Sequence, residues 1–128
     1  MGTIKQVQVT FDCAEPVRVG RFWCEVLGYV GPDGHDDDSW FAASDPTGAG
    51  QRLFFQRVPE GKIVKNRVHL DVRVGTGLVG AERLAALEAE CARLLPLGAV
   101  RGQLLLADGV DESCLNMQDV EGNEFCLD

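Results

Sequence analysis

Apolar and polar residues alternate in two separate segments of the chain. Residues 5–11 and residues 66–74 each carry a valine, leucine or phenylalanine at every second position, with polar residues between them. Because successive side chains of a strand point to opposite faces, this period predicts two half-buried β-strands. Their polar faces would carry Gln6, Gln8 and Thr10 in the first strand and His69, Asp71 and Arg73 in the second.

A helical pattern follows each of these strands. Asp12 and Glu15 have the spacing of a capping box, Pro16 suits a first helical turn, and Gly28 suits the cap after the last turn. Residues 81–95 place Leu84, Leu87, Cys91, Leu94 and Leu95 on one face, which predicts a second amphipathic helix. Shorter strands are predicted at 29–30, 40–43, 52–58, 99–106, 114–118 and 124–127.

The order strand, helix, strand, strand, strand therefore occurs twice. It predicts an α+β fold of two tandem βαβββ modules, residues 1–58 and 66–128, joined by a linker at 59–65 within one domain. Two short matches support the repetition: Leu27–Val30 with Leu97–Val100, and Asp45–Gly48 with Asp119–Gly122.

Composition narrows the class of protein. The 128 residues are 45% hydrophobic and 25% charged, which is typical of a globular domain that needs no metal or disulfide to fold. The net charge is −8, and the longest charge run, Asp36–Asp38, is acidic, so we expect neither nucleic acid nor an anionic membrane as partner. No secretory signal or spanning segment is visible, which favours a cytoplasmic protein.

The five cysteines do not suggest a scaffold. They have irregular spacing, and no CxxC pair occurs, which argues against a disulfide framework and a thiolate zinc knuckle. We expect most of them to be small buried residues in a reduced protein.

The alternation also suggests where a binding site lies. If the two modules are related by pseudosymmetry, Gln6 and His69 would face each other across a cleft with apolar walls from Leu115, Met117, Phe54 and Trp40. The same polar faces would simply meet water if the sheets were open. Asp71 and Arg73 could form an exposed ion pair, or Arg73 could bind a substrate carboxylate.

Four segments together carry a family resemblance. IKQVQVTFDCAEPVRVGRFWCEVLGY, QRLFFQRVPEGK, NRVHLDVRV and DVEGNEFCLD resemble the vicinal oxygen chelate superfamily, which includes glyoxalase I, methylmalonyl-CoA epimerase, extradiol dioxygenases, and bleomycin and fosfomycin resistance proteins. The chain is most similar to the glyoxalase-like subgroup, whose members mostly lack an assigned activity. The resemblance implies paired modules forming a curved mixed sheet around a cavity, and often a homodimer.

The resemblance also implies a metal site in some relatives, with one ligand from the first and last strand of each module. These positions fall on Gln6, on His69, on Cys126 where Glu is usual, and near Phe54 or Gln56. Only His69 is an ordinary ligand for Zn, Ni, Fe or Mn, so the set is an unusual one.

Two hypotheses about function follow. The first is a protein that binds a small organic ligand without an intact metal site. The second is a lyase, isomerase or dioxygenase that depends on one divalent metal ion, with Glu124 moving the proton. A pure dimerisation module is less favoured, because a polar inward face that binds nothing is costly. The candidate ligand-binding residues are Gln6, Gln8, Trp40, Gln56, His69, Asp71, Arg73 and Met117.

Overall fold

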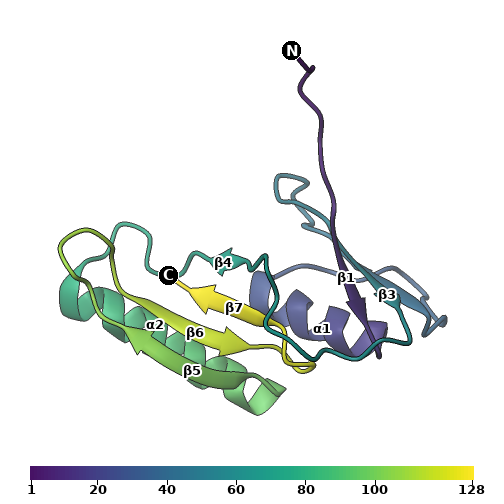
Figure 1. The fold of residues 1–128 in the computed structure, drawn as a ribbon. Coiled ribbons are helices and arrows are strands. Elements are labelled where there is room, and N and C mark those ends of the chain that lie inside the picture. Colours follow the sequence, from purple (N-terminus) through teal and green to yellow (C-terminus); the bar gives the residue numbers. More distant parts are fainter. The chain divides into compact units, whose positions relative to one another are not determined.

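The chain contains two β-sheets, and each sheet packs against one α-helix (Figure 1). The computed structural model describes residues 1–128. The chain divides into two units, Met1–Gly61 and Lys62–Asp128, and the division falls within the expected linker. The α+β class predicted from the sequence is confirmed.

The first unit contains β1 (Val9–Cys13), α1 (Pro16–Leu27), β2 (Trp40–Ala43) and β3 (Leu53–Arg57). Its sheet has the order β1-β3-β2, with β1 parallel and β2 antiparallel to β3. The strand expected at 29–30 is reduced to an isolated bridge between Val30 and Ser44, so this unit has three strands instead of four.

The strand expected at residues 5–11 begins late. Val9 is the first paired residue, and its partner Leu53 is also the first residue of β3. Residues before Val9 have no neighbouring strand to pair with, and Val7 is 70% exposed. Alternation alone therefore placed the strand start too early.

Helix α1 anchors the first unit. Phe22, Trp23 and Val26 are buried, and Gly20 packs so closely on Phe41 that an added Cβ would lie 2.1 Å from its ring. The helix ends at Gly28, which takes the left-handed conformation predicted for the cap.

The expected capping box is wrong. The N-cap residue is Glu15, and it makes no side-chain cap hydrogen bond. Asp12 instead accepts a hydrogen bond from Gln56 Nε2 at 2.8 Å, across the β1–β3 pair.

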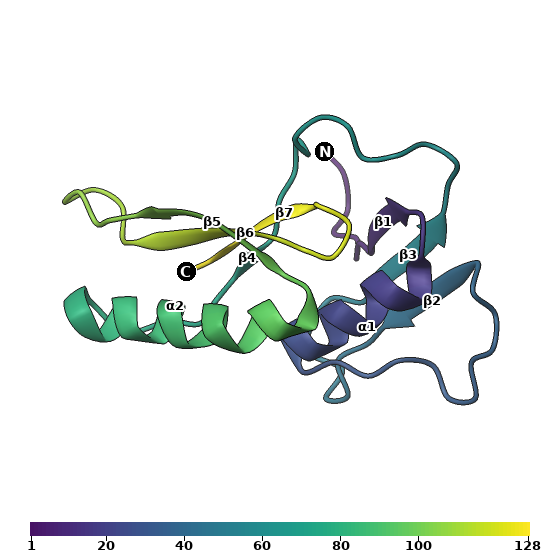
Figure 2. The same ribbon diagram turned by 90° about the horizontal axis from the view of Figure 1, so that it is seen from below.

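The second unit has the full βαβββ order. It contains β4 (Asp71–Val72), α2 (Gly80–Leu94), the short 3-10 helix η1 (Leu95–Leu97), β5 (Val100–Leu105), β6 (Cys114–Gln118) and β7 (Glu124–Leu127). The strand order is β4-β7-β6-β5, with β4 parallel to β7. Figure 2 shows α2 running along one face of this sheet.

Helix α2 and the sheet bury a common core. Leu87, Cys91 and Leu94 face inward from the helix, and alternate residues of β6 and β7 do so from the sheet: Leu115, Met117, Phe125 and Leu127. Leu95, expected on the buried face, is 43% exposed. The α-helix stops before it because Pro96 has no N–H to continue the hydrogen-bond ladder.

Strand β4 is much shorter than the nine residues expected at 66–74. Only Asp71 and Val72 pair with β7, and Val68, expected to face inward, is 79% exposed. Side-chain hydrogen bonds of Asn66 hold the preceding segment in place of a strand ladder.

The opposite edge of this sheet is irregular. Strand β5 shifts register against β6 between Arg101 and Leu104. At this shift Gly102 lies against Asn116, whose carbonyl oxygen would be 2.9 Å from an added Cβ.

No helix in the structure combines the length and apolar character needed to cross a membrane.

The matching segments Asp45–Gly48 and Asp119–Gly122 form turns of the same structure. The Oδ1 atoms of Asp45 and Asp119 accept a hydrogen bond from the amide two residues later, at 2.8 and 2.9 Å respectively. Gly48 and Gly122 have φ of 78° and 86° and donate to the carbonyls of these aspartates at 3.0 Å. The local sequence match therefore corresponds to a matching Asx turn in each unit.

Candidate functional site

The polar face of the second sheet borders an open cavity of about 950 Å³. Asp71 on β4 lies opposite Cys126 on β7, which lies opposite Asn116 on β6, so these residues form one cross-strand row. All three line the cavity, together with His69 and Arg73. The polar side of the strand, predicted from alternation, thus borders a cavity.

Three potential metal donors meet in this row. One ligand atom each from His69, Asp71 and Cys126 lies within 4.8 Å of the other two, and His69 Nε2 is 3.1 Å from Asp71 Oδ1. His69 and Asp71 are somewhat under half exposed, so the group is accessible from solvent. The structure therefore brings together His69 and Cys126, two of the residues expected to hold a metal.

The thiol of Cys126 is held in its protonated form. It donates to Asn116 Oδ1 at 3.1 Å. Burial, followed by the nearby Cys114 and the carboxylates of Asp71 and Asp128, raises the pKa of Cys126 to about 11. Burial also raises the pKa of Cys114. Neither cysteine is poised as a nucleophile at neutral pH, because the thiolate is the reactive form.

The two arginines at the cavity already have partners. Arg73 Nη1 lies 3.2 and 3.1 Å from the two carboxylate oxygens of Asp128. Arg83 is 8% exposed, and its guanidinium donates to the carbonyls of Ser113 and Gly75 at 3.0–3.1 Å. Arg83 therefore joins α2 to the β5–β6 loop and to the segment after β4.

The β5–β6 connection forms one side of the cavity. Asp108 Oδ1 accepts hydrogen bonds from the amides of Val110 and Asp111 at 2.9 and 2.8 Å, and these bonds lower the pKa of Asp108. Asp111 and Glu112 also line the cavity, and the carboxylate of neither makes a hydrogen bond or ion pair within the chain. Leu104, Leu105 and Leu106 provide the adjoining apolar wall.

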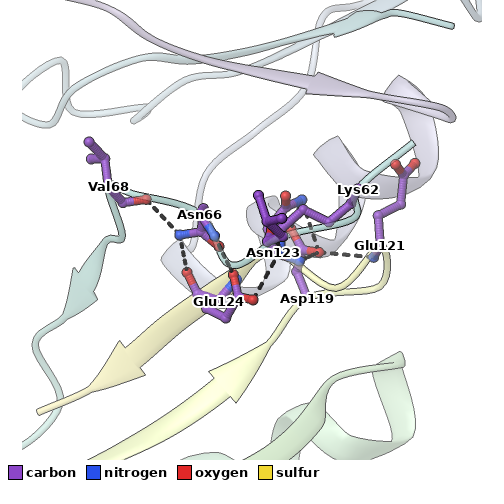
Figure 3. Close-up of polar contacts among 8 residues, drawn as sticks. Lys62, Asn66, Val68, Asp119, Glu121, Asn123 and Glu124 are labelled. Carbon is purple, nitrogen blue, oxygen red and sulfur yellow. Dashed lines mark hydrogen bonds and ion pairs between the residues drawn. The ribbon is translucent and has the colours of Figure 1, made fainter. Parts of the chain in front are cut away.

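Glu124, the expected proton-transfer residue, makes an ion pair and hydrogen bonds with the segment before β4 (Figure 3). Its Oε1 is 3.0 Å from Lys62 Nζ, and its Oε2 accepts a hydrogen bond from the backbone N–H of Asn66 at 3.1 Å. Asn66 Oδ1 in turn accepts from the Glu124 amide at 2.7 Å. Burial opposes the negative charge, but these bonds outweigh it and lower the pKa of Glu124. A catalytic role for Glu124 stays a prediction; its observed partners are structural, and it does not line the cavity.

Three other expected ligand-binding residues lie in the first unit. Gln56 on β3 is opposite Trp40 on β2, and the Trp40 ring stacks on Phe54 with a centroid distance of 5.8 Å and an interplanar angle of 11°. Gln8 lies immediately before β1 and accepts a hydrogen bond from Arg52 at 3.1 Å. Their part in ligand binding stays a prediction.

Gln6 and Met117 lie elsewhere than the strand pattern predicted. Gln6 is exposed and lies outside β1, so it is not a strand residue, and its facing arrangement with His69 stays a prediction. Met117 was expected in the cavity wall, but it is 1% exposed and does not line the cavity. It alternates with Asn116 along β6, so its side chain belongs to the opposite, helix-covered face.

Several cavity residues were not expected from the sequence: Arg83, Leu104, Leu105, Leu106, Asp108, Asp111, Glu112, Ser113, Cys114, Asn116 and Asp128. Asn116 had a usable signal, because it is a polar residue between Leu115 and Met117 in a predicted strand. The loop residues had none, since a turn between strands has no period that indicates which way its side chains point.

The sequence matches one known protein family over most of its length. Residues 8–127 match the family described as the glyoxalase-like domain. The chain belongs to this family. The match of residues 8–127 confirms the expected membership of the vicinal oxygen chelate superfamily.

Solved structures share the fold of the glyoxalase-like domain at low sequence identity. A glyoxalase/bleomycin resistance protein/dioxygenase family enzyme from Burkholderia phytofirmans is 14% identical with a TM-score of 0.71, over 94% of each chain. The fosfomycin resistance protein FosX from Listeria monocytogenes, complexed with Mn(II) and 1S,2S-dihydroxypropylphosphonic acid, is 10% identical with a TM-score of 0.71, over 98% of this chain and 90% of that one. A glyoxalase-related enzyme from Fulvimarina pelagi is 16% identical with a TM-score of 0.66, over 97% and 87%. No curated protein sequence matches significantly.

The donor set of this glyoxalase-like domain fits some metals better than others. A histidine nitrogen, a carboxylate oxygen and a cysteine sulfur form a mixed set that suits Zn²⁺, and three protein ligands would leave a position open for substrate. Mn²⁺ prefers oxygen donors, of which this group offers only the carboxylate of Asp71.

Proposed function

We propose that this glyoxalase-like domain binds a small organic molecule in the cavity of its second unit, and that binding needs no metal ion. The observation that carries the proposal is the row formed by Asp71, Cys126 and Asn116, flanked by His69 and Arg73, along a cavity of about 950 Å³. Small-molecule sites commonly have volumes of roughly 300–1,000 Å³ and combine apolar walls with a few convergent polar groups.

The protein itself supplies partners for the potential metal ligands. His69 pairs with Asp71, and the thiol of Cys126 donates a hydrogen bond to Asn116 Oδ1. A metal ion would have to displace both contacts, and Cys126 would have to lose its proton to become a strong ligand. These two costs favour the metal-free proposal.

A second candidate function rests on the same three donors. Because His69, Asp71 and Cys126 converge within 4.8 Å, they could hold one divalent ion. Such an ion would supply Lewis-acid polarisation of a substrate oxygen, as a lyase, isomerase or dioxygenase of this superfamily requires. The residues of this chain would then serve as its ligands and orient the substrate.

Metal analysis separates the two candidates. The protein is purified without a metal-affinity tag, and Zn, Ni, Fe and Mn are measured against protein concentration. The only other histidine, His35, provides a matched control because its Nε2 contacts the Trp40 carbonyl in the first unit. We expect less than stoichiometric metal in the wild type, His69→Ala and His35→Ala. One ion per chain, lost in His69→Ala and kept in His35→Ala, would establish the metal-dependent alternative.

Ligand binding is tested in the presence of EDTA. A library of small organic compounds is screened by thermal shift, and hydrogen exchange then shows which segments each hit protects. We expect hits that persist in EDTA and protect β4, β6 and β7. If every hit disappears in EDTA, or if hits protect only residues 1–61, the proposal is wrong.

We also propose that the chain forms a homodimer in the cytoplasm. The resemblance supports the dimer, and five irregularly spaced free cysteines are typical of a protein kept in a reducing compartment. Light scattering coupled to size-exclusion chromatography tests the first point, since a mass of 13.9 kDa would indicate a monomer.

A further inference from the structure

The cavity of the second unit has a strongly unequal charge. Its lining includes two guanidinium groups, from Arg73 and Arg83, and one histidine. It also includes five carboxylates: Asp71, Asp108, Asp111, Glu112 and Asp128. A cleft lined by an excess of one charge attracts ligands of the other.

The positive groups are already engaged by the protein. Arg73 contacts Asp128, and Arg83 is buried with its donors directed at the carbonyls of Ser113 and Gly75. The carboxylates of Asp111 and Glu112, in contrast, have no partner within the chain. The groups left for a ligand are therefore predominantly negative.

Apolar surface lies beside these carboxylates. Leu104, Leu105 and Leu106 line the same cavity, and Leu105 and Leu106 are 41% and 65% exposed. Exposed leucines at the rim of a cavity mark surface that an apolar ligand can cover. A fully hydrophilic cation would leave this part of the wall unused.

We propose that the cavity takes an organic cation, an amine or quaternary ammonium group attached to an apolar body. The charged group would lie near Asp111 and Glu112, and the apolar body would cover the leucine wall. This inference rests on the proposed function and adds the ligand class to it. The phosphonic acid bound by FosX from Listeria monocytogenes carries the opposite charge.

Two xanthene dyes of similar size and opposite charge provide the test. Binding of cationic rhodamine 6G and anionic fluorescein to the full chain is measured by fluorescence anisotropy at low and high salt. Asp111→Asn/Glu112→Gln removes two cavity charges whose side chains have no partners in the chain. Asp33→Asn/Asp36→Asn removes two exposed charges from the first unit and is the matched control for the net charge.

We expect rhodamine 6G to bind and fluorescein not to bind. The cavity double variant should raise the Kd of rhodamine 6G by about tenfold, or about 1.4 kcal/mol, and the control should change it less than about twofold. Rising salt should weaken wild-type binding. Equal effects of the two double variants, or binding of fluorescein as tight as that of rhodamine 6G, would overturn the inference, and so would absence of rhodamine 6G binding.

Failure of this inference can be told apart from failure of the proposed function. If the thermal-shift screen yields neutral or anionic compounds that protect β4, β6 and β7, the cavity binds ligands but the cationic class is wrong. If no compound of any charge protects these strands, the proposed function itself fails.

Discussion

Replacing Asp119 with alanine tests how much a buried turn carboxylate stabilises the second unit. Asp119 is 1% exposed and lies in the turn between β6 and β7. Its Oδ1 accepts hydrogen bonds from the amides of Glu121 and Asn123 at 2.9 and 3.0 Å, and both carboxylate oxygens accept from Asn123 Nδ2 (Figure 3). Alanine would leave all these donors without their acceptor.

The expected magnitude follows from these contacts. A hydrogen bond to a charged group contributes about 1.5–3 kcal/mol, and a buried donor left unpaired costs about 1–3 kcal/mol. Glu121 and Asn123 are only half-buried, so water can replace part of what is lost. We therefore expect Asp119→Ala to lower the free energy of unfolding by about 2–4 kcal/mol.

Asp45 provides the matched control. It makes the same turn contact, but in an exposed turn of the first unit, so Asp45→Ala should cost less than Asp119→Ala. Urea unfolding followed by far-UV circular dichroism measures both losses, and hydrogen exchange shows whether the effect of Asp119→Ala is concentrated in β6 and β7. Equal losses for the two variants, or a loss below about 1 kcal/mol for Asp119→Ala, would refute the reasoning.

Three further changes have expected outcomes. Gly20→Ala should lower the free energy of unfolding by about 1–3 kcal/mol, because the new Cβ overlaps Phe41 and this cost exceeds the gain from alanine's better helix propensity. Thermal unfolding should show partial recovery of stability when Phe41→Leu is added. Gly122→Ala should cost about 1–2 kcal/mol in urea unfolding, because its φ of 86° disfavours a side chain. Hydrogen bonds from Arg101 lower the pKa of Glu88 below its usual 4.5, so their contribution should be complete above that pH and disappear as the pH falls through the lowered value. The urea midpoints of wild type and Glu88→Gln should differ at pH 7 and converge in acid; a difference independent of pH would contradict this reasoning.

Local patterns predicted those elements whose boundaries depend on local chemistry. Pro16 and Gly28 marked the limits of α1 because each has a backbone conformation suited to a helix end. The alternation around Val68 was equally regular, but β4 is short because that segment is held by Asn66 through contacts with Glu124, 58 residues away. Such a distant partner leaves no trace in local periodicity.

The residues of the candidate site were also only partly predictable from the sequence. Strand parity predicted that His69, Asp71 and Arg73 share one face, and all three line the cavity. The row from Asp71 through Cys126 to Asn116 depends on the register between strands, which one sequence does not specify. The direction of the Asp111 side chain depends on the path of a loop, so the acidic side of the cavity became visible only in three dimensions.

The slipped register of β5 has a consequence for solubility. Strand β5 ends the sheet order of the second unit, and a regular outer strand is a template on which further chains can stack. The slip between Arg101 and Leu104, with Gly102 fitted against Asn116, interrupts the row of backbone donors and acceptors that such stacking would need. Edge-to-edge aggregation through β5 is therefore disfavoured. A homodimer in which the two sheets join through β5 is disfavoured for the same reason.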